Sequence, residues 1–218
     1  MLWTLAACLI TWTPEGPQDT EEPPAVDSDQ DGWPDELEEA VGSDPEDCGS
    51  VPVGDGQWAN CRQLSVDWEE EGWELGQRPP NWSLMDQYGR DLRLYDFASQ
   101  VTVIQISAMW CGACEAASAD ANVLMSPYDD EGVLLLTLLT ENKDSEPPTR
   151  KNLKSWSEDF NLGRRLVTAQ QVETEEEEAW RAWNVTGLPV YFVLDRELRL
   201  VGSTDDGSLE DLVALAFD

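Results

Sequence analysis

The chain has 218 residues, 41% of them hydrophobic, enough for one domain of ordinary size and a smaller module. Its 13 Lys and Arg are set against 45 Asp and Glu, and the net charge of −32 argues against nucleic acid and anionic membrane surfaces as partners. The chain contains no His, which excludes Cys-His proteases, Ser-His-Asp hydrolases and zinc sites that use His.

The chain opens with a short apolar segment that ends at Cys8. Its last four residues, Leu-Ala-Ala-Cys, resemble a bacterial lipobox, in which the Cys is lipidated after secretion. No Lys or Arg precedes the apolar run, so we expect residues 1–8 to be a truncated signal with Cys8 as the lipidation site; the alternative is an incidental Cys. Residues 9–26 are rich in Pro and acidic residues and predict a disordered spacer.

A calcium-type loop follows at residues 27–38, which read DSDQDGWPDELE. Carboxylates occupy loop positions 1, 3, 5 and 9, Gly occupies position 6 and Glu position 12, the spacing that turns alternate oxygens toward one Ca²⁺. The predicted ligands are Asp27, Asp29, Asp31, the carbonyl of Trp33, Asp35 and Glu38. With residues 41–45, the loop resembles a thrombospondin type 3 repeat. The spacer cannot form the helix that precedes an EF-hand loop, so we expect a structural Ca²⁺; the alternative is an acidic turn without metal.

Cys48 and Cys61 bracket a Gly-rich stretch with few apolar residues. A disulfide between them would stabilise this loop by roughly 3 kcal/mol, and two unpaired thiols are the alternative. We therefore interpret residues 27–62 as one small module that contains the calcium loop and this disulfide. Residues 63–75 are interpreted as a linker that docks Trp68 and Trp73 on the following domain.

Residues 76–218 alternate between strand-like and helix-like patterns, which predicts one α/β domain. Apolar, β-branched runs predict buried strands, and a capping box that begins at Thr174 predicts a helix start. The expected strands are 81–89, 90–95, 101–107, 132–140, 190–194 and 198–202, and the expected helices are 114–125, 149–160, 174–183 and 208–217.

Three segments of this domain resemble the TlpA/ResA-like redoxins (AhpC/TSA-type) of the thioredoxin superfamily, which are thiol–disulfide oxidoreductases. They are residues 82–94, 103–114 and 183–195, and they include the runs WSLMDQYG, VIQISAMWCGAC and WNVTGLPVYFVLD. The resemblance implies a thioredoxin-like fold, a central mixed sheet flanked by helices. It also implies a cis-proline at Pro189, facing the C-x-x-C motif.

The resemblance makes Cys111 and Cys114 the catalytic pair. Cys111 is expected at a helix N-terminus, where unpaired N–H groups favour the thiolate that attacks a disulfide, and Cys114 resolves the mixed disulfide. The expected substrate-binding residues are Trp110, Gly112, Ala113, Leu188 and Pro189.

Gln105 departs from the pattern of thioredoxins, which place a buried Asp at this strand position to assist proton transfer. Gln105 cannot take up a proton, and Glu115 together with the net charge opposes formation of the thiolate. The sequence therefore predicts slower exchange than in thioredoxin.

The sequence leaves other functions open: a redoxin-type thiol peroxidase, a calcium-stabilised surface binding module with an inert disulfide, and a zinc half-site at the C-x-x-C motif. The preferred interpretation is a bacterial envelope enzyme with no catalytic cofactor. We expect it to be a monomer at the periplasm or cell surface, with a lipid anchor as its only membrane contact. Its expected partners are protein disulfides or dithiols and an envelope electron donor or acceptor.

Overall fold

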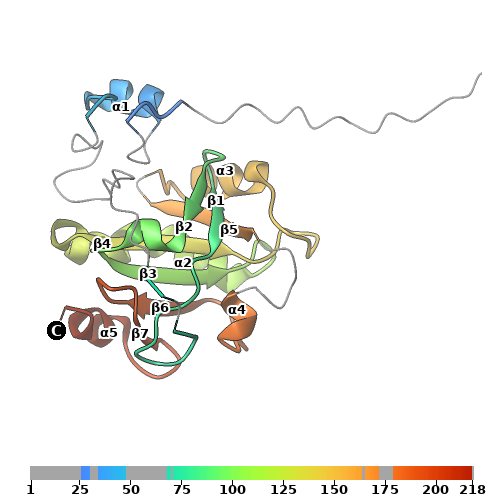
Figure 1. Ribbon diagram of the computed structural model, residues 1–218. Helices are drawn as coiled ribbons and strands as arrows, with labels where there is room; N and C mark the ends of the chain where they lie inside the picture. Colours follow the sequence, from blue (N-terminus) through green and yellow to red (C-terminus); the bar gives the residue numbers. More distant parts are fainter. Residues whose placement is uncertain are drawn as a thin grey trace, which may run out of the picture.

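The computed structural model describes residues 26–29, 34–47, 68–69, 71–163, 165–171 and 179–217 (Figure 1). Its strands are β1 (Ser83–Asp86), β2 (Asp91–Arg93), β3 (Val101–Ser107), β4 (Val133–Leu139), β5 (Leu166–Gln171), β6 (Val190–Leu194) and β7 (Leu200–Ser203). Its α-helices are α1 (Asp35–Val41), α2 (Gly112–Met125), α3 (Arg150–Asp159), α4 (Ala179–Ala182) and α5 (Leu209–Leu215). Two 3₁₀ helices, η2 (Leu94–Phe97) and η3 (Ser126–Glu131), complete the set.

The seven strands form one mixed sheet in the order β2-β1-β5-β4-β3-β6-β7. Strands β3, β4 and β5 run parallel, whereas β6 is antiparallel to β3 and β1 is antiparallel to β5. The α2 and α3 crossovers join parallel neighbours, so the carboxyl ends of β3, β4 and β5 meet at one edge of the sheet. The expected central mixed sheet flanked by helices is confirmed.

The centre of the sheet is made by β3 and β4, whose sequences VTVIQIS and VLLLTLL are buried at every position. Such mainly apolar runs, buried without alternation, are typical of parallel strands covered on both faces. Two buried clusters lie on the two faces of the sheet. One contains residues of α2, α3 and α5, including Ala121, Trp156 and Val213, and the other contains Phe97, Ile104 and Ala179 from η2, β3 and α4.

Three expected elements differ from the structure. Strand β5 was not predicted, because its sequence LVTAQQ mixes apolar and polar residues without a clear period. The expected strand 90–95 ends at Arg93 and continues as η2, where the side chain of Asp96 accepts a hydrogen bond from the backbone N–H of Arg93. The expected helix 174–183 is described only as α4, since residues 172–178 lie outside the described residues.

Residues 71–78, with Trp68 before them, form a strap along the outer strand β7. The Gly76 N–H donates to the Leu200 carbonyl, and the Leu200 N–H donates to the Gln77 carbonyl. These two bonds pair the strap with the outer strand, whose N–H and C=O groups would otherwise face solvent. Trp73 stacks on Trp82 with ring centroids 5.6 Å apart. The expected docking of the linker tryptophans is therefore observed.

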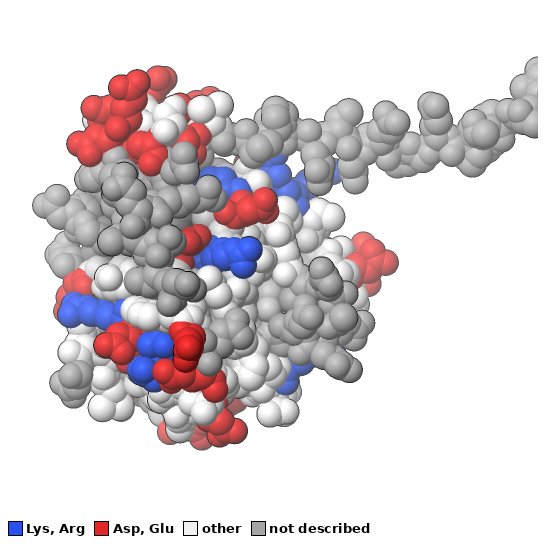
Figure 2. Space-filling view, in the orientation of Figure 1, with Lys and Arg blue, Asp and Glu red and all other residues white. Residues whose placement is uncertain are grey.

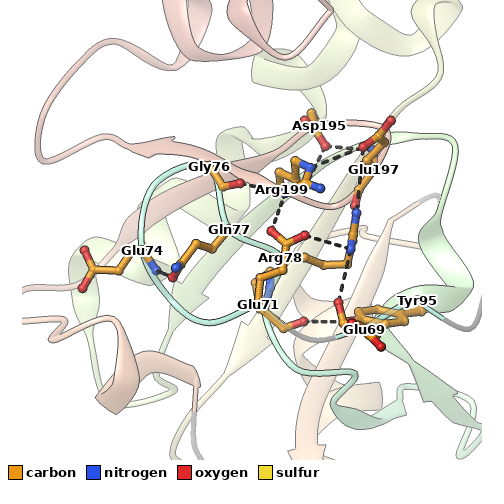
Figure 3. A network of polar contacts seen from close by, with 11 residues as sticks. Glu69, Glu71, Glu74, Gly76, Gln77, Arg78, Tyr95, Asp195, Glu197 and Arg199 are labelled. Carbon is orange, nitrogen blue, oxygen red and sulfur yellow. Dashed lines mark hydrogen bonds and ion pairs between the residues drawn. The ribbon is translucent and has the colours of Figure 1, made fainter.

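Arg78 holds the strap against the turn between β6 and β7 (Figure 3). Its Nε donates to the Glu197 carbonyl at 2.8 Å, and its guanidinium carbon lies 4.3 Å from the ring centroid of Trp68. Glu71 connects the two arginines of the network, because its carboxylate accepts hydrogen bonds from both Arg78 and Arg199. Arg78 is only 5% exposed, so its charge is balanced within the protein rather than by water.

Acidic side chains gather over α1 (Figure 2). The first turn of this helix carries Asp35, Glu36 and Glu38, which suits the positive end of a helix dipole. Across the part of the chain that the structure describes, no helix is long and apolar enough to cross a membrane.

Candidate functional site

Cys111 and Cys114 lie at the carboxyl edge of the sheet, where the chain leaves β3 and enters α2. Cys111 is the N-cap residue of α2, and its sulfur accepts a hydrogen bond from the Cys114 N–H at 3.2 Å. The two cysteines form a disulfide, with their Cα atoms 5.2 Å apart. The start of the helix therefore offers N–H groups to the sulfur of Cys111, which favours a thiolate there once the disulfide is reduced.

The two sulfur-bearing residues differ in exposure. Cys111 is 8% exposed and Cys114 is 0% exposed. Only the first cysteine of the motif can therefore meet another molecule. Cys114, one helical turn further along, can reach only Cys111, which is the arrangement that an attacking and a resolving thiol require.

A second segment approaches Cys111 from the loop before β6. The Leu188–Pro189 peptide bond is cis, and the Leu188 carbonyl oxygen lies 3.7 Å from the Cys111 sulfur. A cis bond at an X-Pro step turns the chain sharply. The structure thus brings two of the predicted substrate-binding residues to the reactive cysteine.

The other predicted substrate-binding residues surround the exposed side of the pair. Trp110 is 52% exposed, while Gly112 and Ala113 face solvent at the start of α2. A Cβ built on Gly112 would meet nothing within 4 Å, so the surface above the disulfide is open. These small residues leave room for a partner that forms a mixed disulfide with Cys111.

Glu141 was not identified from the sequence, yet it supports the loop that carries Cys111. Its carbonyl accepts the Met109 N–H at 2.9 Å, and its carboxylate accepts the Trp110 indole N–H at 2.6 Å. The available signal was its position two residues after β4, at the same edge of the sheet as Cys111. Because Glu141 fixes the indole, it sets where the exposed Trp110 ring stands beside the reactive sulfur.

A buried polar chain lies along the strands beneath the pair. The Gln105 amide donates to the Tyr191 hydroxyl at 3.1 Å, and the Thr137 hydroxyl donates to the Gln105 carbonyl oxygen at 3.0 Å. Burial raises the pKa of Tyr191, and the nearby carboxylate of Asp120 adds to this rise. Gln105 is fully buried, so a neutral side chain occupies this interior position. Its partner Tyr191 was not identified from the sequence.

Four of the six predicted calcium ligands lie within the described residues: Asp27, Asp29, Asp35 and Glu38. Glu38 is fully buried, and within the described residues neither of its carboxylate oxygens accepts a hydrogen bond of ordinary geometry. Burial raises the pKa of Glu38 to about 7, and the negative charges of Asp29 and Asp27 contribute to this rise, although Ser43 lies close enough to lower the pKa in part. Glu38 thus marks an unusually unfavourable place for an anion.

The remaining predicted sites are Asp31, Trp33, Cys8, Cys48 and Cys61, and they lie outside the described residues. Within the described residues alone, no three Asp, Glu or Cys side chains converge closely enough to hold a metal ion. The calcium loop, the Cys48–Cys61 disulfide and the lipidation of Cys8 therefore remain predictions.

The chain is similar to curated bacterial proteins named as thiol-disulfide oxidoreductases. It is 23% identical over 133 residues to the thiol-disulfide oxidoreductase ResA of Bacillus thuringiensis, covering 61% of this chain and 70% of the relative. It is 27% identical over 122 residues to ResA of Geobacillus thermodenitrificans, covering 56% and 64%. The C-x-x-C motif here is the Cys111–Cys114 pair.

Solved structures show the fold. The thioredoxin domain of a thiol-disulfide oxidoreductase from Bacteroides vulgatus superposes with a TM-score of 0.52 at 15% identity, covering 66% of this chain and 96% of that domain. The fold is therefore thioredoxin-like, as the sequence predicted. Residues 75–202, more than half of the chain, match the AhpC/TSA family. This match contains the C-x-x-C motif and the cis-Pro loop, and the chain belongs to the AhpC/TSA family.

Proposed function

We infer that the protein is a thiol–disulfide oxidoreductase that exchanges disulfides with protein substrates through Cys111 and Cys114. One observation carries this inference: the disulfide lies at the first turn of α2, with a reachable sulfur on Cys111 and the cis-Pro loop 3.7 Å away. The similarity to two ResA proteins supports the same reaction class.

The reaction balances without a further cofactor. In the reduced protein, the Cys111 thiolate attacks a substrate disulfide; one S–S bond forms to Cys111, and the substrate's own S–S bond breaks and releases a thiolate. The Cys114 thiolate then attacks the Cys111 sulfur, which restores the Cys111–Cys114 disulfide and frees the second substrate sulfur. Two electrons pass to the substrate, and the reverse sequence oxidises a dithiol substrate.

The position of the cis-Pro loop suits it to hold the substrate chain. The Leu188 carbonyl faces the Cys111 sulfur and offers an acceptor for an extended substrate backbone. Trp110, the residue before Cys111, is exposed, and Glu141 fixes its indole ring. We propose that a substrate lies between these two residues while its sulfur reacts.

Reduction of insulin disulfides by the full chain, with dithiothreitol as electron donor, tests this function. We expect turnover in the unmodified protein and in Ser126→Ala, a control at the exposed end of α2. Cys111→Ser should abolish turnover, and Cys114→Ser should accumulate a mixed disulfide that mass spectrometry detects. Equal turnover in Cys111→Ser would refute the assignment. Rapid consumption of hydrogen peroxide with no insulin turnover would instead favour a peroxidase.

We further propose that residues 27–38 bind a structural Ca²⁺. The proposal is supported by the buried carboxylate of Glu38, whose oxygens accept no hydrogen bond of ordinary geometry from the described residues. The negative charges of Asp29 and Asp27 lie close enough to repel it. Arg90 offsets part of the charge of Asp27 from 3.4 Å, and a cation held there would neutralise the rest. Asp35 accepts hydrogen bonds from the backbone N–H and the hydroxyl of Ser28, both at 2.7 Å. These bonds suit loop position 9, because the residue at this position often contacts Ca²⁺ through a water molecule.

Calcium titration of the EDTA-treated full chain by calorimetry tests this site. Glu38→Gln should weaken binding by at least about tenfold, because the last loop residue supplies two oxygens. Glu39→Gln removes the same charge from the exposed neighbouring residue and should bind like the unmodified chain. The thermal unfolding midpoint should show the same difference: Ca²⁺ should raise it for the Glu39→Gln control but not for Glu38→Gln. No heat of binding in the unmodified chain would rule the site out.

We propose an extracytoplasmic location, at the periplasm or cell surface, with a lipid on Cys8 as the tether. Five cysteines in a chain with a lipobox-like start support secretion, since structural disulfides persist in oxidising compartments. Fractionation of expressing bacteria tests this: the chain should pellet with membranes, and Cys8→Ser should move it to the soluble fraction. Mass spectrometry without reductant should find Cys48 linked to Cys61.

A further inference from the structure

A pocket of about 250 Å³ opens at the carboxyl ends of β4 and β5. Leu139 and Thr140 line one wall at the end of β4, Trp180 of α4 lines another, and the exposed residues Pro147 and Gln171 lie at the rim. None of the described residues that line it is charged. The pocket therefore lies at the same edge of the sheet as Cys111 and suits an apolar group.

The first wall of the pocket is hydrogen-bonded to the loop that carries Cys111. Thr140 donates to the Ser107 carbonyl twice, from its N–H at 2.8 Å and from its hydroxyl at 3.1 Å. The next residue, Glu141, binds Met109 and Trp110 as described above. The position of this wall is thus fixed relative to the reactive cysteine.

The wall formed by Trp180 leads to the cis-Pro loop. The Trp180 carbonyl accepts the Val185 N–H at 3.0 Å, and the chain reaches Leu188 three residues later. Gln170 ties the same helix to β5, because its side-chain oxygen accepts the Ala179 N–H at 2.7 Å. One wall is therefore bonded to the segment that leads into Cys111, and the other continues into the cis-Pro loop that contacts Cys111.

We propose that this pocket binds an apolar side chain of the protein substrate, two or three residues away from the substrate cysteine. The proposal rests on the function inferred above and names a specificity determinant for it. Adjacent strands lie about 4.8 Å apart, so β4 and β5 lie roughly 5 and 10 Å from β3, and an extended peptide covers this distance in two or three residues at about 3.3 Å each. Sites for drug-sized ligands span about 300–1,000 Å³, so a smaller pocket suits a single side chain.

Kinetics with two synthetic disulfide peptides test the proposal. One peptide carries Leu three residues from its cysteine, and the other carries Ser at that position. We expect the KM of the unmodified full chain to be roughly tenfold lower for the Leu peptide, the discrimination that one buried apolar group provides. Gln171→Trp and Pro147→Trp, both at exposed positions of the rim, should fill the pocket and remove this preference while leaving kcat similar.

Two controls separate this proposal from the proposed function. Lys151→Trp, at an exposed site on α3, should keep the preference, and glutathione disulfide should react equally with all variants because it has no such side chain. If glutathione disulfide and both peptides fail to react, the proposed function fails. In that case the pocket is still tested by binding versions of the two peptides in which the peptide's Cys is replaced by Ser, with binding measured by tryptophan fluorescence. Equal binding of these peptides, or a preference that survives both rim variants, would overturn the proposal.

Discussion

Gln105 shows how one residue changes the interior beneath the redox pair. Its amide oxygen and nitrogen are both used, by the Thr137 and Tyr191 hydroxyls respectively, so a neutral side chain satisfies a position that is fully closed to solvent. No proton can be exchanged at this position. The proton that leaves or reaches Cys114 during the reaction must therefore travel by another route, which agrees with the expectation of slow exchange.

Gln105→Leu should lower the free energy of unfolding by about 1–3 kcal/mol, because it leaves the buried Thr137 hydroxyl and the partly buried Tyr191 hydroxyl without their partner. Urea unfolding measures this change. Gln171→Leu, at the exposed end of β5, is the matched control; it loses only a solvent-exposed hydrogen bond to Asp91 and should change the free energy by less than about 0.5 kcal/mol. Equal effects of the two substitutions would mean that the buried chain contributes no stability.

At the residue scale, the sequence predicted the site where the chemistry depends on residue type. Cys111, Cys114 and Pro189 were identified because a C-x-x-C after a buried strand and a Pro before another strand form a recognisable pair of segments. Glu141 and Tyr191 were missed, because their roles depend on β4 and β6 lying on either side of β3. No local pattern encodes such a neighbour.

The strap is the element with the clearest electrostatic dependence. The pKa of Glu71 lies below its ordinary value of 4.5, chiefly because Arg199 donates a hydrogen bond to its carboxylate. A lowered folded-state pKa stabilises the fold above the unfolded pKa, and this contribution is lost as the pH falls through the folded-state value. The strap should therefore loosen from β7 below about pH 4.5.

Unfolding of the unmodified chain and of Glu71→Gln, measured from pH 7 to pH 3, tests this dependence. The unmodified chain should be more stable at pH 7, and the difference should shrink as the pH falls below 4.5, the ordinary value of Glu71. Glu74→Gln, at an exposed residue of the strap, should show no such convergence. A difference that grows on acidification would contradict the sign of the argument.

At the element scale, prediction succeeded where a long run of residues was mainly apolar or where a helix had a clear N-cap. The mainly apolar runs of β3 and β4 and the Thr149 cap of α3 were clear signals. The strand β5 gave none, because its register is set by pairing with β4 and β1 rather than by its own residues. Helix α1 begins inside the predicted calcium loop at Asp35, which the ligand spacing does not reveal.

At the scale of the whole molecule, the net charge of −32 opposes compaction. Ion pairs offset this repulsion locally. Arg90 joins Asp27 to the buried Asp86 on β1: its guanidinium lies 3.4 Å from the Asp27 carboxylate, and its Nε lies 2.7 Å from the Asp86 carboxylate. Most other carboxylates repel one another through solvent, where salt screens them. The fold should therefore be more stable at higher ionic strength.

Thermal unfolding in EDTA at 10 and at 150 mM NaCl measures this effect. We expect the midpoint to rise by a few degrees, because the Debye length shortens from about 30 to about 8 Å across this range. Calcium is excluded by the chelator, so its binding cannot produce the shift. A midpoint that falls with added salt would mean that attractive pairs such as Asp27–Arg90 outweigh the overall repulsion.

The central claim is that Cys111 and Cys114 form a working redox pair, and their reduction potential tests it most directly. The full chain would be equilibrated in glutathione and dithiothreitol buffers of graded potential, and the fraction with a Cys111–Cys114 disulfide would be measured by mass spectrometry after alkylation. We predict one reversible two-electron transition between about −120 and about −300 mV, the range of exchange enzymes and their partners. A disulfide that stays oxidised in every buffer until the chain unfolds would contradict the account and leave a structural cross-link in its place.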